Sequence, residues 1–187
     1  MKRTGLFALM ISLLFLGGCA VADTGMEEFK AWQEALRTAE TVSFTAAVTA
    51  DFGDKTFDYA AVLSYADGTA MVELQEPEIL RGVMLRTADG GMTLAYDGAS
   101  LELGDLDGLS PASALPLVLE ALQSGRVLDA ARVSEDGVDC RVFTLASAPG
   151  ELRVWLLRDG LVPTRAELSE KGRVTLICDI ADWATFS

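Results

Sequence analysis

The chain has 187 residues and 50% of them are hydrophobic, which suffices for one globular domain with a buried core and excludes an intrinsically disordered protein. Its formal net charge of −13 argues against nucleic-acid partners, because phosphate binding requires a basic surface. The chain has no histidine, so the usual general base, the Ser-His and Cys-His dyads and the commonest neutral metal ligand are excluded.

The first residues have the order of a bacterial lipoprotein signal peptide. Two basic residues precede an apolar run, 6–16, that is too short to span a bilayer permanently. The sequence LGGC at 16–19 is similar to a lipobox, in which cleavage occurs just before the cysteine. We therefore expect residues 1–18 to be removed and Cys19 to become the lipid-modified first residue. An ordinary secretory signal, cut near the same place, is the alternative.

Acyl chains on Cys19, palmitate among them, would anchor the protein to the extracytoplasmic side of a bacterial membrane. Residues 19–24 form only a short tether, with a reach of about 20 Å up to the first helix, so the domain is expected to sit against its membrane. No linker rich in Pro, Ser or Gly divides the remainder. We therefore expect residues 25–187 to form a single domain.

Hydrophobic spacing changes from helical to strand-like soon after this tether. An amphipathic helix is predicted over 25–39, beginning with the capping box Thr24-x-x-Glu27. Apolar and polar residues then alternate, which predicts about ten short antiparallel strands, at 42–52, 57–65, 70–74, 81–87, 92–96, 99–103, 138–146, 151–158, 163–169 and 173–181. Asp-Gly pairs between alternating runs predict tight hairpins, at 67–68, 89–90, 97–98, 107–108, 136–137 and 159–160.

One apolar segment, 110–125, interrupts the strands. Pro116 lacks an N–H and disfavours a helical conformation at Leu115, so we predict a short or kinked helix over 116–123 that stops at Gly125. This helix is apolar on nearly all sides and must be covered, so we expect it to lie on the concave face of the sheet. Two interpretations stay open: a permanent core helix, or a movable lid hinged at Pro116 and Gly125.

The sequence shows no motif that specifies catalysis or a bound cofactor. The densest acidic stretches fall at turns and strand ends, which is typical of a solvated surface. The stretch 105–108 (DLDG) is similar to the start of a calcium loop but lacks the later acidic ligands. Phosphate-binding glycine motifs and the Gly-x-Ser-x-Gly elbow are absent from the sequence. We therefore expect no catalytic residue, no cofactor and no metal site.

Two cysteines, Cys140 and Cys178, remain after lipidation, and both fall on the apolar phase of a predicted strand. An extracytoplasmic location permits a disulfide between them. Two further strands separate them in the predicted order, however, so we expect two buried, reduced thiols rather than a bridge.

Several segments together resemble the LolA/LolB-like superfamily of lipoprotein carriers and receptors, which includes the RseB-type sensor domain. These are the N-terminal helix leading into 40–46 (ETVSFTA), the strand opening at 77–82 (PEILRG), the hairpin at 94–98 (LAYDG) and the Pro-containing helix within 111–123. The resemblance implies an α+β fold with a strongly curved antiparallel sheet. This sheet would be an incomplete half-barrel whose concave face is covered by the N-terminal helix and the inserted mid-chain helix.

The resemblance also implies two possible functions. In the carriers the cavity holds acyl chains, so this protein would be a membrane-anchored, non-catalytic lipoprotein that binds an apolar ligand, either a lipid or the acyl chains of a lipoprotein. The alternative is an envelope or germination accessory lipoprotein that docks and supports a peptidoglycan-modifying enzyme or sensor through protein contacts. The candidate ligand-binding residues are Phe44, Val48, Val72, Leu74, Leu94, Leu115, Val118, Leu119 and Leu122.

The lipobox makes membrane attachment testable at one residue. Cys19→Ser removes the acyl acceptor, so the domain is expected to leave the membrane fraction and keep its fold. Cell fractionation and circular dichroism measure the two effects. Persistent membrane attachment of the processed variant would contradict the anchor.

Overall fold

The computed structural model describes residues 25–186 except 52, 54, 89–90, 105–112 and 136, so the predicted signal peptide and Cys19 lie outside the described residues. Its helices are α2 (Met26–Thr38), α3 (Ala114–Ser124) and the short 3-10 helix η1 (Glu78–Leu80). The strands are β1 (Thr41–Asp51), β2 (Thr56–Ala66), β3 (Thr69–Glu76), β4 (Met84–Ala88), β5 (Gly91–Tyr96), β6 (Ala99–Gly104), β7 (Val127–Glu135), β8 (Val138–Ala146), β9 (Glu151–Leu157), β10 (Pro163–Glu170) and β11 (Arg173–Phe186). Within these ranges no helix has the length and apolar character needed to cross a membrane.

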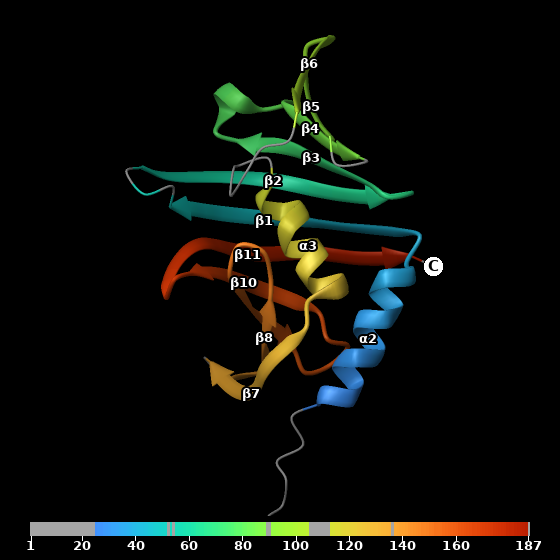
Figure 1. The fold of residues 1–187 in the computed structure, drawn as a ribbon, viewed down its shortest axis with the longest axis vertical. Coiled ribbons are helices and arrows are strands. Elements are labelled where there is room, and N and C mark those ends of the chain that lie inside the picture. The colour runs from blue at the N-terminus through green and yellow to red at the C-terminus, as the bar shows by residue number, and fades with distance from the viewer. Residues whose placement is uncertain are drawn as a thin grey trace, which may run out of the picture.

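The strands form one eleven-stranded antiparallel sheet in the order β6-β5-β4-β3-β2-β1-β11-β10-β9-β8-β7 (Figure 1). Each half is a meander of sequence neighbours, β1 to β6 and β7 to β11. The pairing of β1 with β11, from Thr41 opposite Phe186 to Ala50 opposite Leu176, joins the two halves. The single meander suggested by the hairpin rhythm is therefore two meanders that meet at the first and last strands.

The two edge strands, β6 and β7, are consecutive in sequence but lie at opposite ends of the sheet. The chain between them therefore has to cross the sheet, and α3 lies on this crossing (Figure 1). Helix α2 packs on the same face, and the sheet stays open because β6 and β7 do not pair with each other. This arrangement confirms the predicted α+β class with a curved, incomplete half-barrel and two covering helices.

Turns form at the Asp-Gly pairs wherever both residues are described. The pair at 67–68 has φ of 50° and 74°, and the pair at 97–98 has φ of 48° and 77°. Two consecutive left-handed residues give the turn that matches the twist of a two-residue hairpin, and these pairs connect β2 to β3 and β5 to β6. The pair at 159–160 lies in a longer turn from β9 to β10, in which the left-handed residues are Gly160 and Leu161.

Three details of the predicted elements were wrong. Strand β7 (Val127–Glu135) was missed, since an edge strand with polar residues on both sides has little alternation. Helix α3 begins at Ala114, two residues before the predicted start, because Pro116 lies in the first turn, where backbone N–H groups have no helical partner in any case. Helix α2 has Gly25 as its N-cap and no side-chain cap, so the Thr24 capping box is not its N-cap.

Cys140 and Cys178 are both buried and are not joined in a disulfide, as the sequence predicts. Cys178 belongs to the main core, whereas Cys140 packs with Val142 and Trp155 in a small separate cluster. Strands β9 and β10 lie between their strands, which places them about 14 Å apart across the sheet. A disulfide needs its two Cβ atoms within about 4.5 Å, so no bridge forms.

Burial makes Cys178 an unreactive thiol. Burial, together with the nearby Asp179 carboxylate, raises its pKa to about 12, and only the thiolate reacts quickly with alkylating reagents. In the folded protein at about pH 8, Cys178 is expected to stay unlabelled by iodoacetamide, and denaturation in urea should expose it to full labelling. Peptide mass mapping under non-reducing conditions measures this and should find no Cys140–Cys178 link; equal labelling rates in the folded and denatured states would contradict the burial.

The end of α3 leaves no room for a side chain. A Cβ on Gly125 would lie 2.4 Å from the carbonyl oxygen of Ala121 and 2.9 Å from that of Ala146. Gly125→Ala is therefore expected to lower the free energy of unfolding by about 1–3 kcal/mol, because backbone has to move. The control is Gly91→Ala, where the nearest atom, the Ala88 carbonyl oxygen, is 3.7 Å away; its change should stay within about 0.5 kcal/mol in urea unfolding. Equal losses of unfolding free energy in the two variants would show that the close approach of the Ala121 and Ala146 carbonyl oxygens is not the cause.

Candidate functional site

The concave face carries rows of apolar side chains that continue from strand to strand. In the first half, Leu94 lies opposite Leu85, Leu85 opposite Val72, Val72 opposite Leu63 and Leu63 opposite Phe44. In the second half one row continues through Cys178, Ala166, Val154 and Phe143. All of these are buried in one core cluster except Leu94, which is half-buried against it. The face is therefore apolar from β5 to β8.

All nine predicted ligand-binding residues meet in this core. Phe44 and Val48 come from β1, Val72 and Leu74 from β3, and Leu94 from β5, while α3 supplies Leu115, Val118, Leu119 and Leu122. Leu115, Val118 and Leu122 are fully shielded, so no void large enough for water borders them. Helix α3 thus fills the space over the concave face around these three residues.

A row of aromatic rings fixes α2 to the sheet. Phe29 stacks on Phe143 of β8 with ring centroids 4.0 Å apart and on Trp32 at 5.5 Å. Trp32 approaches Trp183 of β11 at 6.2 Å, and Trp183 stacks on Phe44 of β1 at 5.2 Å. Aromatic pairs at these separations stabilise beyond their buried area. Helix α2 is therefore held along its length across β8, β11 and β1.

An ion pair adds a polar contact at the start of α2. Arg141 of β8, whose side chain is 7% exposed, donates from Nη1 to Glu28, and the Arg141 Nε has no partner among the described residues. Gly25 has φ of 72°, a left-handed conformation that favours glycine, and a Cβ there would also force this guanidinium to shift. The Glu28 side chain is 54% exposed, so the pair is only partly buried and water screens the attraction between its charges. The first turn of α2 is thereby fixed to the sheet.

Two glutamine side chains tie α3 to α2. Gln33 Nε2 of α2 donates to the carbonyl oxygens of Leu122, at 3.1 Å, and Gly125, at 3.0 Å. In return Gln123 Nε2 of α3 donates to the carbonyl oxygen of Leu36, at 3.4 Å. These bonds satisfy carbonyls near the C-terminal ends of both helices, which lack helical partners. They hold α3 at its C-terminal end.

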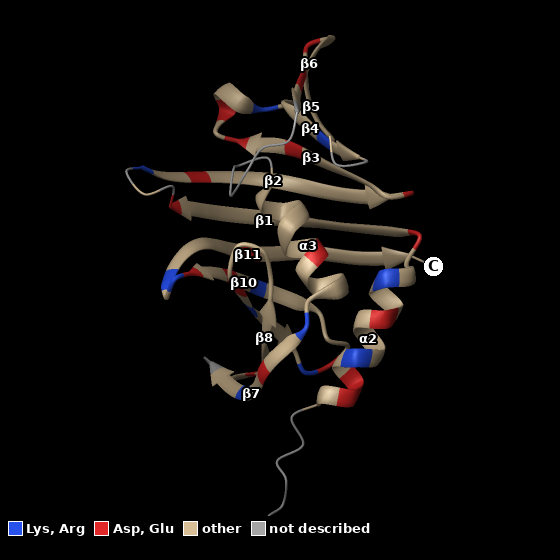
Figure 2. Ribbon diagram, viewed as in Figure 1, with Lys and Arg blue, Asp and Glu red and all other residues tan. Residues whose placement is uncertain are grey.

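Charged residues lie mostly away from the concave face. Figure 2 shows several Lys, Arg, Asp and Glu residues along α2, whereas α3 is almost free of charge. Four surface hollows lined by described residues have volumes of about 140–350 Å³, and none of these four is lined by the nine predicted residues. Among the described residues there is no group of three or more Cys, Asp or Glu placed to hold a metal ion.

Sequence reasoning missed the polar contacts that position the helices. Gln33 and Gln123 carry no motif, and their role depends on how two helices cross. In the structure Arg141 shares the inward face of β8 with Phe143 and Leu145, whereas Cys140 and Val142, the apolar phase that the sequence indicates, lie on the outer face. A charged residue at an inward position of an apolar strand is the signal that could have indicated a buried ion pair.

Comparison with known proteins yields structural neighbours only, because no protein-family model and no curated protein sequence matches the chain. An uncharacterized conserved protein from Thermus thermophilus has a TM-score of 0.52 at 10% identity, over 87% of this chain and 88% of that chain. A LolA superfamily protein from Nitrosomonas europaea has a TM-score of 0.43 at 13% identity, over 86% of this chain and 93% of that chain. A chain of the CwlD amidase–GerS lipoprotein complex from Clostridioides difficile has a TM-score of 0.47 at 16% identity, over 85% of this chain and 94% of that chain. Similar solved structures thus include LolA-like proteins and lipoproteins, as the sequence predicted, and at these identities the likeness concerns the fold alone.

Proposed function

We propose that this protein is a membrane-anchored, non-catalytic lipoprotein that binds acyl chains, of a lipid or a lipoprotein, between α3 and the concave face of its sheet. The observation that supports this most is the apolar face itself, which extends beyond what a single helix needs for burial. Half-buried Leu94 and 60% exposed Leu101 lie opposite each other on β5 and β6 and continue it towards the edge. An acyl chain is the kind of ligand that fits a long apolar surface.

Ligand binding requires α3 to move away from the sheet, because its side chains fill the space that the acyl chain would occupy. Exposing α3 to water would cost roughly 1.5–3 kcal/mol for each large side chain, so it moves only if other apolar atoms replace its contacts. An acyl chain supplies about 0.8 kcal/mol per buried methylene and can offset that loss. The glutamine bonds hold α3 at its C-terminal end, which makes its N-terminal end the part that swings away. We therefore favour the lid interpretation over the permanent core helix.

A second candidate function is the docking of an envelope protein. Ile79 is 83% exposed, and Tyr96 and Leu101 are also exposed, all of them within β3 to β6 and the turn that contains η1. Large exposed apolar side chains are common at interaction surfaces. This part of the sheet lies at the end opposite the start of α2, which is the end nearest the proposed anchor (Figure 1).

The lid interpretation predicts a specific phenotype for Leu119→Ala. Native mass spectrometry of the purified lipoprotein should detect bound lipid, and the variant should retain less of it. Its loss of unfolding free energy should stay below the range of about 2–5 kcal/mol expected for a fixed core position. The matched control is Leu157→Ala, which removes the same atoms from the small cluster on the opposite face and should leave lipid retention unchanged.

Other outcomes separate the two functions. A lipoprotein that neither carries lipid nor exchanges a fluorescent acyl probe would disprove acyl binding. If Ile79→Ser then abolished cross-linking to an envelope protein in cells while the fold stayed intact, the docking function would replace it.

A further inference from the structure

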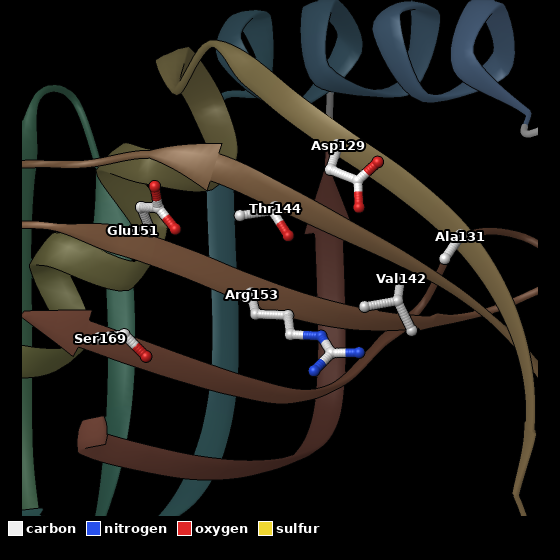
Figure 3. A pocket seen from close by; sticks show the side chains of 7 residues that line it. All are labelled: Asp129, Ala131, Val142, Thr144, Glu151, Arg153 and Ser169. Atoms are coloured by element: carbon white, nitrogen blue, oxygen red, sulfur yellow. The ribbon is translucent and has the colours of Figure 1, made fainter. Parts of the chain in front are cut away.

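A polar hollow of about 350 Å³ lies on the outer face of the sheet, over β7 to β10 (Figure 3). Phe143 and Leu145 of β8 point into the core, so the alternate residues Val142 and Thr144 point to the opposite face, away from α2 and α3. Val142 is the buried apolar residue of the hollow. The polar side chains that line it are Asp129, Thr144, Glu151, Arg153 and Ser169.

Strand register brings these side chains together from four strands. Asp129 of β7 lies opposite Thr144 of β8, and Thr144 lies opposite Arg153 of β9. Glu151 of β9 lies opposite Ser169 of β10. Figure 3 shows Thr144 between the two carboxylates, with Glu151 on one side and Asp129 on the other. The hollow therefore presents one guanidinium, two separated carboxylates and two hydroxyls.

A tryptophan below Arg153 positions its guanidinium. The Arg153 Cζ atom lies 4.8 Å from the centroid of the Trp155 ring, and Trp155 is itself buried beside Val142 and Cys140. Stacking on an aromatic face leaves the N–H groups in the guanidinium plane available for other partners. Arg153 is thus oriented without using its hydrogen-bond donors.

The polar groups of the hollow do not satisfy each other. Among the described residues, none of its five polar side chains forms a hydrogen bond or an ion pair. Elsewhere on the same outer face, opposed polar residues do pair: Thr49 donates to Asp58 at 2.7 Å, and Arg165 donates to Asp179 at 2.7 Å. The hollow therefore combines an oriented donor with acceptors that are open to a ligand.

From this charge pattern we infer that the hollow binds a free dibasic amino acid, which carries one carboxylate and two ammonium groups. The ligand carboxylate pairs with Arg153, and its two ammonium groups pair with Asp129 and Glu151. A polyanion is repelled by the two carboxylates and by the acidic protein as a whole, and a simple diamine leaves Arg153 unpaired. The volume is within the range of small-molecule sites, roughly 300–1,000 Å³. This inference is independent of acyl binding on the other face.

The test is isothermal titration calorimetry of the purified lipoprotein in detergent with L-lysine and with the peptide Gly-Gly-Lys. Saturable binding is expected for L-lysine, and binding at least about tenfold weaker is expected for Gly-Gly-Lys, because its lysine has lost the α-ammonium group to the peptide bond. Arg153→Gln and Asp129→Asn should each weaken binding about tenfold or more, because each removes a charge-assisted hydrogen bond. The matched control is Arg173→Gln, an exposed arginine outside the hollow that should change the affinity less than about twofold.

Three results would overturn the inference. The first is no saturable binding of L-lysine. The second is unchanged affinity in both Arg153→Gln and Asp129→Asn, with folding confirmed by thermal melting. The third is cadaverine, a diamine without a carboxylate, binding as tightly as lysine, since that would show only the general attraction of cations to an acidic protein.

Discussion

The need to cover one apolar face is the constraint on which the rest of this structure depends. An eleven-stranded sheet that closed on itself would shield its inner side chains, but here β6 and β7 stay at opposite edges. The inward residues of both meanders must then be covered by other parts of the chain. Helix α3 can do this because it lies on the only described connection between the two edges, and α2 supports it through the aromatic row and the Gln33 bonds.

The sequence predicts most of this architecture because side-chain direction in a strand has a period of two. That period assigned Phe44, Val72 and Leu94 correctly to one face without any knowledge of their partners. It could not predict strand β7, because exposure at the sheet edge weakens the alternation of apolar and polar residues. It also misplaced the start of α3, because a proline in the first turn of a helix does not disrupt it. The pairing of β1 with β11 lies beyond local patterns altogether, since it joins residues far apart in sequence.

Polar sites were harder to predict than apolar ones for a related reason. An outward Asp129, Thr144 or Arg153 is, taken alone, an ordinary solvated strand residue. The three become one site only through the register of β7, β8 and β9, which the sequence does not reveal. Arg153 and Trp155 are the partial exception, because residues two apart on a strand share a face and an Arg-x-Trp sequence indicates stacking.

Strand β7 follows α3 directly in the chain and also lines the hollow on the outer face of the sheet. Gly125, which ends α3 and accepts from Gln33, comes only four residues before Asp129, which lines the outer hollow. As an edge strand, β7 is held by β8 alone, with a register shift between Val127 and Asp129. Movement of α3 at its C-terminal end would therefore displace one wall of the hollow, whereas a swing of its N-terminal end would not. The Gln33 bonds to Leu122 and Gly125 thus tie the C-terminal end of α3, and with it the chain that enters β7, to α2.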